Sequence, residues 1–172
     1  MDQPTDGYEA PDRRRRGRLG HVDASRAASD TAPVTRTLID TPGLYAGVPY
    51  SYAAIASSGS TVFTAGACPI DSEGRVVAPD DVAGQTRCAL DNLVAALRSA
   101  GCGLENVVKT TVYVAARERA DLLVAWKEVE RRFGSAGPPS TLLGVTVLGF
   151  SDQLVEVEAV AALGSGSGEF AP

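Results

Sequence analysis

The sequence predicts an α+β domain in which two helices cover one face of a β-sheet. Two stretches repeat apolar residues at helical spacing, and the stretches around them alternate apolar and polar residues as strands do. Their order along the chain is β-β-α-β-α-β-β. The patterned part of the 172-residue chain, residues 37–163, is long enough to form one hydrophobic core.

The first two strands are predicted to form a hairpin. Ser51–Ala56 and Thr61–Ala65 are apolar runs, and the Ser-Ser-Gly-Ser sequence of residues 57–60 has the small and polar residues of a tight turn. A short additional strand before Pro49 also fits the pattern.

The two helices are marked by end signals as well as by spacing. The first is predicted to begin after Asp80 and Asp81, which suit the N-cap position, and to end at Gly101. The second runs from about Glu118 to Phe133 and ends at Gly134. Their apolar stripes are Ala89, Leu90, Leu93, Val94 and Leu97 in the first helix, and Leu122, Trp126, Val129 and Phe133 in the second.

Three further strands are predicted from alternation of period two. Val108–Val114 places valines and Thr110 on one side, and Lys109, Thr111 and Tyr113 on the other. Ser140–Leu148 follows the Pro138-Pro139 pair, and Gln153–Leu163 is the last strand. No repeat of 20–50 residues interrupts this order.

The two ends of the chain lack such patterns. Residues 1–36 are rich in Asp, Arg, Ser, Ala and Pro and are expected to be a disordered, Arg-rich tail. Residues 164–172 begin with a Gly-Ser-Gly-Ser-Gly run, which has the composition of a flexible tail.

Histidine and cysteine usage excludes several kinds of catalytic site. The chain has one histidine, His21, in the polar tail, which disfavours Ser-His-Asp triads, Cys-His pairs and HExxH zinc sites. Cys68, Cys88 and Cys102 have no CxxC spacing, so we expect small buried residues rather than a disulfide framework or metal ligands. We expect no metal ion. No run of 18 apolar residues occurs, and we expect a cytoplasmic, reducing environment with no membrane contact.

The distribution of charge bears on nucleic-acid binding. Residues 37–163 contain nine basic and fourteen acidic residues, and an acidic domain is a poor platform for phosphate backbones. The four consecutive arginines of residues 13–16 could contact an acidic partner or nucleic acid weakly, but a solvated tail is the favoured interpretation.

The last strand carries a pair of carboxylates. Alternation places Glu156 and Glu158 on one face and Val155 and Val157 on the other. Side chains two residues apart on a strand are about 7 Å apart, near the separation of paired carboxylates in sugar hydrolases. A half-exposed strand with a charged outer face explains the same pattern and is favoured.

Two loop segments could contact a ligand. Tyr50 ends a Gly-Val-Pro-Tyr turn and has a hydroxyl that can form hydrogen bonds, with Tyr52 two residues later. Gly66, Ala67, Cys68 and Pro69 follow a strand, where a glycine lets backbone N–H groups approach a ligand closely. Each signal is weak alone, because turn tyrosines and strand-end glycines are common.

The order of these motifs resembles that of the RidA/YjgF family, and the resemblance covers nearly all of residues 40–163. The matching segments are Pro49-Tyr50, Gly66-Ala67-Cys68-Pro69, the Gln-x-x-x-Ala-Leu-x-Asn-Leu sequence of Gln85–Leu93, Val107–Val114, and Val155–Ala161.

The resemblance implies a chorismate-mutase-like α+β subunit with a mixed sheet, assembled as a homotrimer with small-molecule sites in the clefts between subunits. The best-known members of the family hydrolyse reactive imines and enamines to keto acids and ammonia without a metal or cofactor. In those members an arginine binds the substrate carboxylate, a glutamate of the last strand positions the attacking water, and backbone groups near the strand-end glycine complete the site.

Carried over by position, Glu156 matches the catalytic glutamate, Tyr50 the early tyrosine and Gly66 the strand-end glycine. The resemblance also implies that Ala67 and Cys68 line the substrate, with Ala67 where a glutamine is common. The arginine is missing: where the family has Pro-Ala-Arg-Thr, this chain has Pro-Pro followed by Ser140 and Thr141. No Arg or Lys follows Arg132, so a small shift of register does not restore it.

This departure leads to two hypotheses. A serine hydroxyl cannot neutralise a carboxylate as a bidentate arginine does, so, unless a neighbouring subunit supplies a basic residue, an atypical enzyme would prefer a neutral or bulky imine, enamine or carbinolamine. Such an enzyme would suit a tailoring step in biosynthesis. The alternative is a non-catalytic, trimeric small-molecule-binding or chaperone-like protein. Endoribonuclease activity, attributed to some relatives, is disfavoured by the acidic domain and the lack of a basic cluster.

Overall fold

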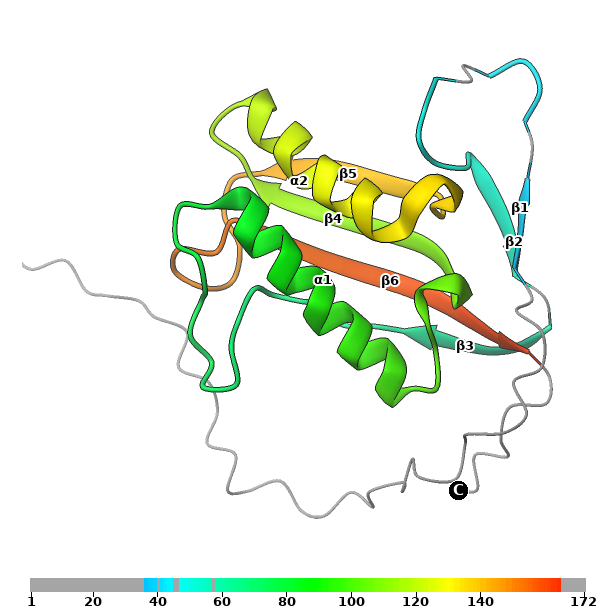
Figure 1. The fold of residues 1–172 in the computed structure, drawn as a ribbon, viewed down its shortest axis with the longest axis horizontal. Coiled ribbons are helices and arrows are strands. Elements are labelled where there is room, and N and C mark those ends of the chain that lie inside the picture. The colour runs from blue at the N-terminus through cyan, green and yellow to red at the C-terminus, as the bar shows by residue number, and fades with distance from the viewer. Residues whose placement is uncertain (1–35, 40, 45–46, 57, 165–172) are drawn as a thin grey trace, which may run out of the picture.

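The computed structural model describes residues 36–39, 41–44, 47–56 and 58–164 (Figure 1). The expected tails, and with them His21 and the arginine run, lie outside the described residues except for Arg36, which begins the first strand, and Gly164, which ends the last one. The elements in chain order are β1 (Arg36–Ile39), β2 (Ala53–Ala56), β3 (Gly59–Phe63), α1 (Val82–Ser99), the 3₁₀-helix η3 (Leu104–Asn106), β4 (Val107–Ala115), α2 (Arg119–Phe133), the 3₁₀-helix η4 (Gly134–Ala136), β5 (Ser140–Val145) and β6 (Val155–Gly164).

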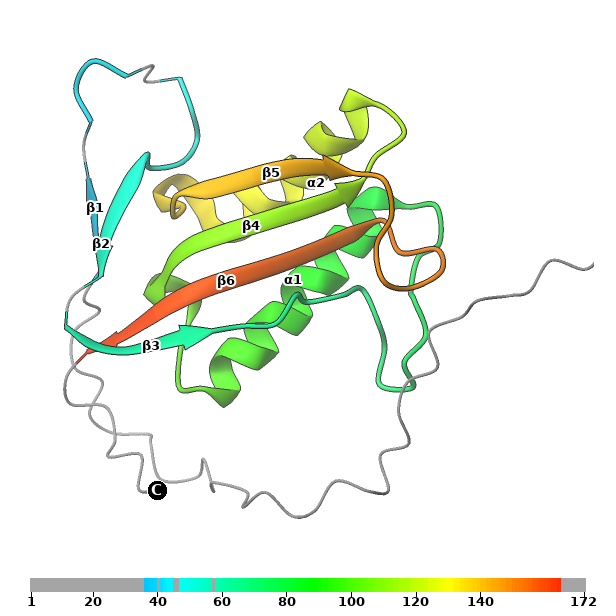
Figure 2. The ribbon, with the colours of Figure 1, turned by 180° about the vertical axis from the view of Figure 1, so that it is seen from behind.

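The main sheet has four strands in the order β3-β6-β4-β5. β6 pairs antiparallel with both β3 and β4, whereas β4 and β5 run parallel, connected by α2. Both helices lie on one face of this sheet, and no helix of the described residues covers the other face, which we call the open face (Figures 1 and 2). The predicted α+β architecture, with a mixed sheet and two helices on one face, is therefore confirmed.

The predicted hairpin between the first two strands is wrong. β2 pairs with β1, the short strand before Pro49, and β3 pairs with β6. Gly59 gives the physical reason, since a Cβ atom there would lie 1.9 Å from the carbonyl oxygen of Leu163. The glycine that suggested a turn instead permits close contact between β3 and β6.

The residues at the helix ends predicted the positions of both helices correctly. The Asp81 carboxylate accepts a hydrogen bond from the backbone N–H of Gly84 at 2.9 Å and caps α1, as predicted. Gly101, just beyond α1, and Gly134, at the end of α2, have φ of +75° and +69°, a conformation that suits glycine. The helices therefore begin and end where their caps require.

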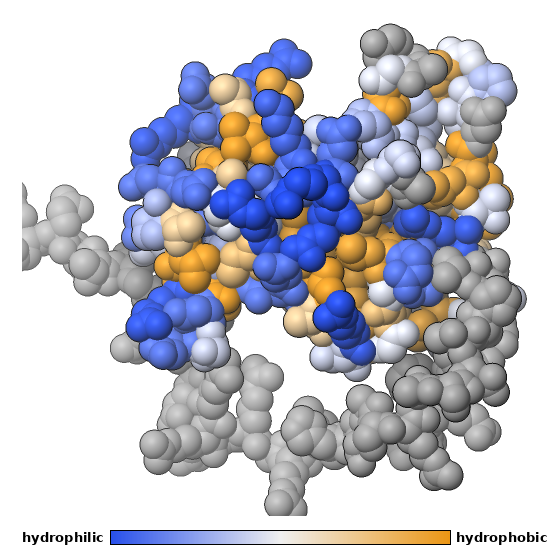
Figure 3. Space-filling model, in the orientation of Figure 1, coloured by the Kyte–Doolittle hydropathy of each residue, from blue (hydrophilic) through white to orange (hydrophobic). Residues whose placement is uncertain are grey.

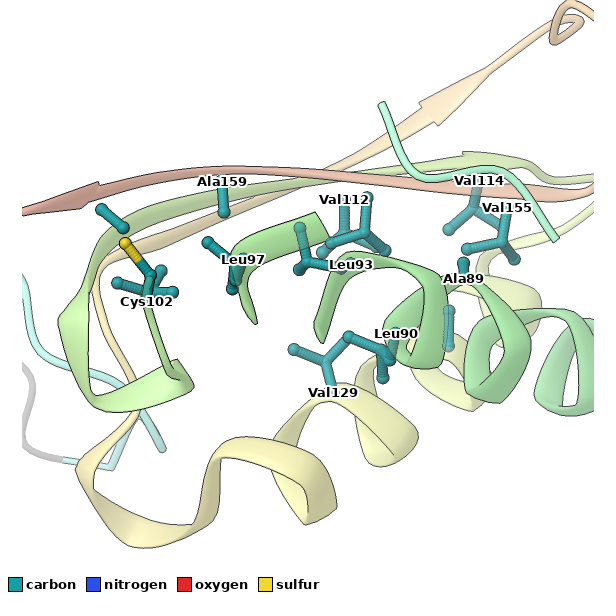
Figure 4. Close-up of a cluster of buried hydrophobic side chains, with 14 of the residues drawn as sticks. Ala89, Leu90, Leu93, Leu97, Cys102, Val112, Val114, Val129, Val155 and Ala159 are labelled. Atoms are coloured by element: carbon teal, nitrogen blue, oxygen red, sulfur yellow. The ribbon is translucent and has the colours of Figure 1, made fainter. Parts of the chain in front are cut away.

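The core lies between the helices and the sheet (Figure 4). Leucines of α1 meet valines of β4 and β6, and each fully buried Leu or Val contributes about 1.5–3 kcal/mol by leaving water. The alternation predicted for β6 is confirmed, because Val155 and Val157 are buried while Glu156 and Glu158 lie on the open face. The fully buried side chains include Leu90, Leu93, Leu97, Val112, Val114, Val155 and Val157.

The outer surface of the two helices is mainly polar, with Leu123 and Val124 of α2 as exposed apolar side chains. Hydrophilic side chains gather over α1 and α2 on the face that Figure 3 shows. Arg87 and Arg132 form ion pairs with Glu128 and Asp91, which link the two helices. No helix in the described part of the chain combines the length and apolar character needed to cross a membrane.

Candidate functional site

Glu156 lies on the open face of the sheet, directly against Gly66. A Cβ atom built at position 66 would lie 1.7 Å from the Oε1 atom of Glu156, so only glycine leaves room for the carboxylate in this position. Gly66 and Glu156 are 90 residues apart in sequence and come together because the chain after β3 continues along β6. The structure thus brings together the two site residues that the family resemblance paired.

Cys68 is the third predicted residue in this cluster. Its thiol donates to Glu156 Oε2 over 3.6 Å, and burial, together with the negative charge of Glu156, raises the pKa of Cys68 to about 11. The thiol is therefore protonated at neutral pH and acts as a weak donor rather than as a thiolate nucleophile. Ala67 points away from this cluster and packs against the core, so only its backbone adjoins the site.

The segment that contains Gly66 and Cys68 is fixed from two sides. The N–H and carbonyl groups of Ala67 bond to Val157 in β6, at 2.8 and 3.2 Å. From α1, the amide of Asn92 donates to the carbonyl oxygens of Cys68 at 2.8 Å and Ile70 at 2.9 Å. Asn92 belongs to the helix motif quoted above, and this contact gives that motif a physical role.

Gln85, the first residue of the same motif, holds the turn that leads into β6. It is fully buried, its side-chain amide donates to the carbonyl of Asp152 at 2.7 Å, and its Oε1 accepts from the N–H of Leu154 at 2.7 Å. Asp152 has a φ of +60°, an uncommon conformation for a residue other than glycine. Gln85 therefore stabilises a strained turn at Asp152, three residues before the start of the strand that carries Glu156.

Ser140 and Tyr50 form a separate group on the helix-covered side of the sheet. Thr110, which is buried, donates its hydroxyl to Ser140 Oγ at 2.8 Å. The Tyr50 ring packs edge-on against Trp126 with centroids 5.8 Å apart, and its hydroxyl has no hydrogen-bond partner among the described residues. A small hollow is lined by both Tyr50 and Ser140. Within one chain, therefore, these two residues do not meet Glu156.

Thr141 faces the opposite way from Ser140, onto the open face of the sheet. Its hydroxyl accepts a hydrogen bond from the ammonium group of Lys109, whose pKa is lowered by burial. Lys109 and Glu158 both line a shallow hollow of about 130 Å³. The Glu158 carboxylate accepts a hydrogen bond from the hydroxyl of Tyr113 at 2.9 Å. A cation thus lies beside the Ser140–Thr141 segment, although none follows it in sequence.

Sequence reasoning missed three side chains of this region: Gln153, Asn92 and Lys109. Gln153 is buried, and its amide donates to Glu156 Oε2 at 3.1 Å. It stands at the start of a predicted strand, where nothing in the local pattern indicates that a polar side chain turns inward. Asn92 was visible only as part of a family motif, and Lys109 only as the polar position of an alternating strand.

The chemistry available at Glu156 is that of a carboxylate beside thiol, amide and backbone groups. Such a carboxylate can exchange protons with a water molecule and a bound substrate. Among the described residues, no group of three or more His, Cys, Asp or Glu side chains could hold a metal ion.

Comparison with known proteins shows the family of the chain. Residues 42–163 match the family described as "Endoribonuclease L-PSP". A RutC family protein of Pyrococcus horikoshii is 35% identical over 113 residues, which are 66% of this chain and 86% of the relative. The 2-iminobutanoate/2-iminopropanoate deaminase of Salmonella typhimurium is 32% identical over 104 residues, 60% of this chain and 80% of the enzyme.

Comparison with solved structures supports the same family. The crystal structure of a protein of unknown function of the conserved Rid protein family, from Yersinia pestis, has a TM-score of 0.69 and 30% identity. The matched region covers 75% of this chain and 99% of the Yersinia protein. With its fold, its motifs and its Gly66–Glu156 pair, the chain belongs to the RidA/YjgF family, the family described as endoribonuclease L-PSP.

Proposed function

We propose that this protein is an enzyme that adds water to a C=N bond, or eliminates it, with Glu156 as the general acid–base group. The observation that carries this proposal is the position of the Glu156 carboxylate. Its Oε1 atom lies against Gly66, while its Oε2 atom accepts hydrogen bonds from the Cys68 thiol and the Gln153 amide. The 2-iminobutanoate/2-iminopropanoate deaminases among the relatives support a reaction of this class.

The proposed reaction needs one proton-transfer group. Glu156 takes a proton from water as the water oxygen bonds to the imine carbon, and it delivers that proton to the imine nitrogen, which becomes the amine of a carbinolamine. Glu156 then accepts the proton of the carbinolamine hydroxyl and delivers it to the amine nitrogen. The C–N bond breaks as the carbonyl group forms, and ammonia leaves. No redox step or cofactor is required.

The substrate we propose is a neutral or bulky imine, enamine or carbinolamine, as in a biosynthetic tailoring step. The position of the family arginine is occupied by Ser140, whose hydroxyl is already bonded to Thr110. Lys109 reaches Thr141 but on the other face of the sheet, so within one chain it does not take the place of that arginine. A free α-carboxylate would therefore lack its bidentate partner.

We propose a homotrimer with small-molecule sites in the clefts between subunits. The open sheet face supports this assembly, since Phe63 is 75% and Leu143 42% exposed there. Tyr50 and Ser140 of one subunit would then have to meet Glu156 of another. Light scattering that gives the mass of three chains would support the assembly, and a monomer at micromolar concentration would contradict it.

The substrate proposal is tested by ammonia release. Freshly generated imines with and without an α-carboxylate are incubated with the protein, and we expect faster release from the neutral imines. Faster release from ordinary imino acids would show that the interpretation of Ser140 is wrong. No release from any imine, with thermal stabilisation by a neutral ligand, would favour the alternative of a non-catalytic binding protein.

Nucleic acid is not the substrate we propose. The acidic balance of residues 37–163 gives little attraction for a phosphate backbone. Lys109, the cation on the open sheet face described above, lies beside the carboxylate of Glu158 in one hollow.

A further inference from the structure

The two carboxylate oxygens of Glu156 have different surroundings. Oε2 accepts a hydrogen bond from the Gln153 amide at 3.1 Å and the weaker one from the Cys68 thiol at 3.6 Å. Oε1 has no hydrogen-bond donor among the described residues and lies over the Cα atom of Gly66. One oxygen is therefore held, and the other is available to a water molecule or substrate.

Gln153 is well suited to hold Oε2, because its own amide is fixed. The residue is only 4% exposed. The amide nitrogen also donates to the carbonyl of Val155 at 3.2 Å, and the amide oxygen accepts from the N–H of Phe150 at 3.1 Å. A flipped amide would turn its oxygen toward two acceptors, the Val155 carbonyl and the Glu156 carboxylate. The network thus allows one orientation, in which an N–H group faces Glu156.

We infer that Gln153 is a positioning residue, which anchors Oε2 of Glu156 and so makes Oε1 the oxygen that exchanges protons in the reaction. This inference rests on the proposed function of Glu156. Cys68 assists as a second donor to the same oxygen. Without Gln153 the carboxylate can rotate about its last side-chain bond, and either oxygen can turn toward the thiol or the solvent.

Two variants test the catalytic consequence. Gln153→Met removes both amide donors in a side chain of similar length, and Gln153→Glu keeps an acceptor for Phe150 but places a second carboxylate against Oε2. We expect kcat for imine hydrolysis to fall by about 10- to 100-fold in both, as misplaced catalytic groups commonly cause, with KM changed less than twofold. Melting temperatures measured in parallel ensure that each variant is assayed folded.

A second readout does not depend on activity. Gln153 lowers the pKa of the Cys68 thiol, whereas Glu156 raises it, so the two residues act on the thiol in opposite directions. The rate at which iodoacetamide alkylates Cys68 at pH 9 is followed by peptide mass spectrometry, with Cys88 as the internal control. We expect the Glu156→Gln variant to react faster than the parent protein and the Gln153→Met variant, which loses the amide without gaining a charge, to react more slowly, while the Cys88 rate stays constant.

The outcomes separate this inference from the proposed function. If the parent protein hydrolyses no imine, the proposed function fails, and the order of alkylation rates alone decides whether Gln153 and Cys68 share Oε2. An alkylation order other than the expected one overturns the inference. With an active parent protein, two further results overturn the inference. One is a folded Gln153→Met variant that keeps the kcat of the parent protein, and the other is a Gln153→Met variant in which only KM changes.

Discussion

Gly66 and Glu156 fit together so closely that a single added carbon would collide with the carboxylate. The Cβ of any larger residue at position 66 would lie 1.7 Å from Oε1 and 2.5 Å from the carboxyl carbon of Glu156. The contact involves the free end of a flexible side chain, so the carboxylate rather than the backbone would move. The glycine therefore determines where the proposed acid–base group lies.

The substitution Gly66→Ala is expected to impair catalysis more than stability. Displacement of Glu156 by about 1 Å or more should lower kcat by about 100-fold, while the fold tolerates the moved side chain. Steady-state kinetics and thermal melting measure the two effects. Gly144→Ala is the matched control, because its Cβ would meet Leu122 at an ordinary 3.6 Å. Equal losses of activity in the two variants would contradict the role of Gly66.

Asn92 is expected to be a stability residue as well as a support of the site. In Asn92→Ala the carbonyl oxygens of Cys68 and Ile70 lose their donor, which should cost about 1–3 kcal/mol of unfolding free energy. Urea denaturation measures the loss. Ser99→Ala, at an exposed position of the same helix, should change the free energy by less than about 0.5 kcal/mol. An unchanged unfolding free energy in Asn92→Ala would show that the segment with Cys68 and Ile70 is held by β6 alone.

The raised pKa of Cys68 predicts a loss of stability in alkaline solution. Burial and the charge of Glu156 raise this pKa from 9.0 to about 11, so between these values the unfolded chain releases a proton that the folded chain retains. Stability should therefore fall as the pH rises from 9 to 11. The Cys68→Ala variant should lose less stability over this interval in denaturation experiments. Parallel curves for the two proteins would mean that the thiol titrates normally.

The Ser140→Arg substitution should restore preference for imino acids. An arginine can pair with an α-carboxylate through two hydrogen bonds, and we expect at least a tenfold gain in kcat/KM for 2-iminopropanoate relative to a neutral imine. The variant leaves the hydroxyl of buried Thr110 without its present partner, so a modest fall in melting temperature is expected. An unchanged substrate ratio would indicate that position 140 does not contact the carboxylate.

The sequence predicted the helices better than the strand pairing, for a physical reason. Helix ends depend on neighbours such as Asp81 and Gly84, which are visible in the sequence, whereas Gly59 meets Leu163 more than 100 residues away. The pairing of Glu156 with Gly66 was accessible only through family resemblance. Gln153 and Lys109 could not be predicted, because their partners are set by the packing of separate segments and not by local pattern.

Proton transfer by Glu156 is tested by a matched pair of variants at Glu156 and Glu158. Glu158 lies on the same face of β6, two residues further along, and its carboxylate accepts a hydrogen bond from Tyr113. Ammonia release from a neutral imine is measured for Glu156→Gln and Glu158→Gln, both checked for folding. We expect loss of turnover in Glu156→Gln and retention of activity within a few-fold in Glu158→Gln. Full activity in the Glu156→Gln protein would show that Glu156 does not perform the proton transfers.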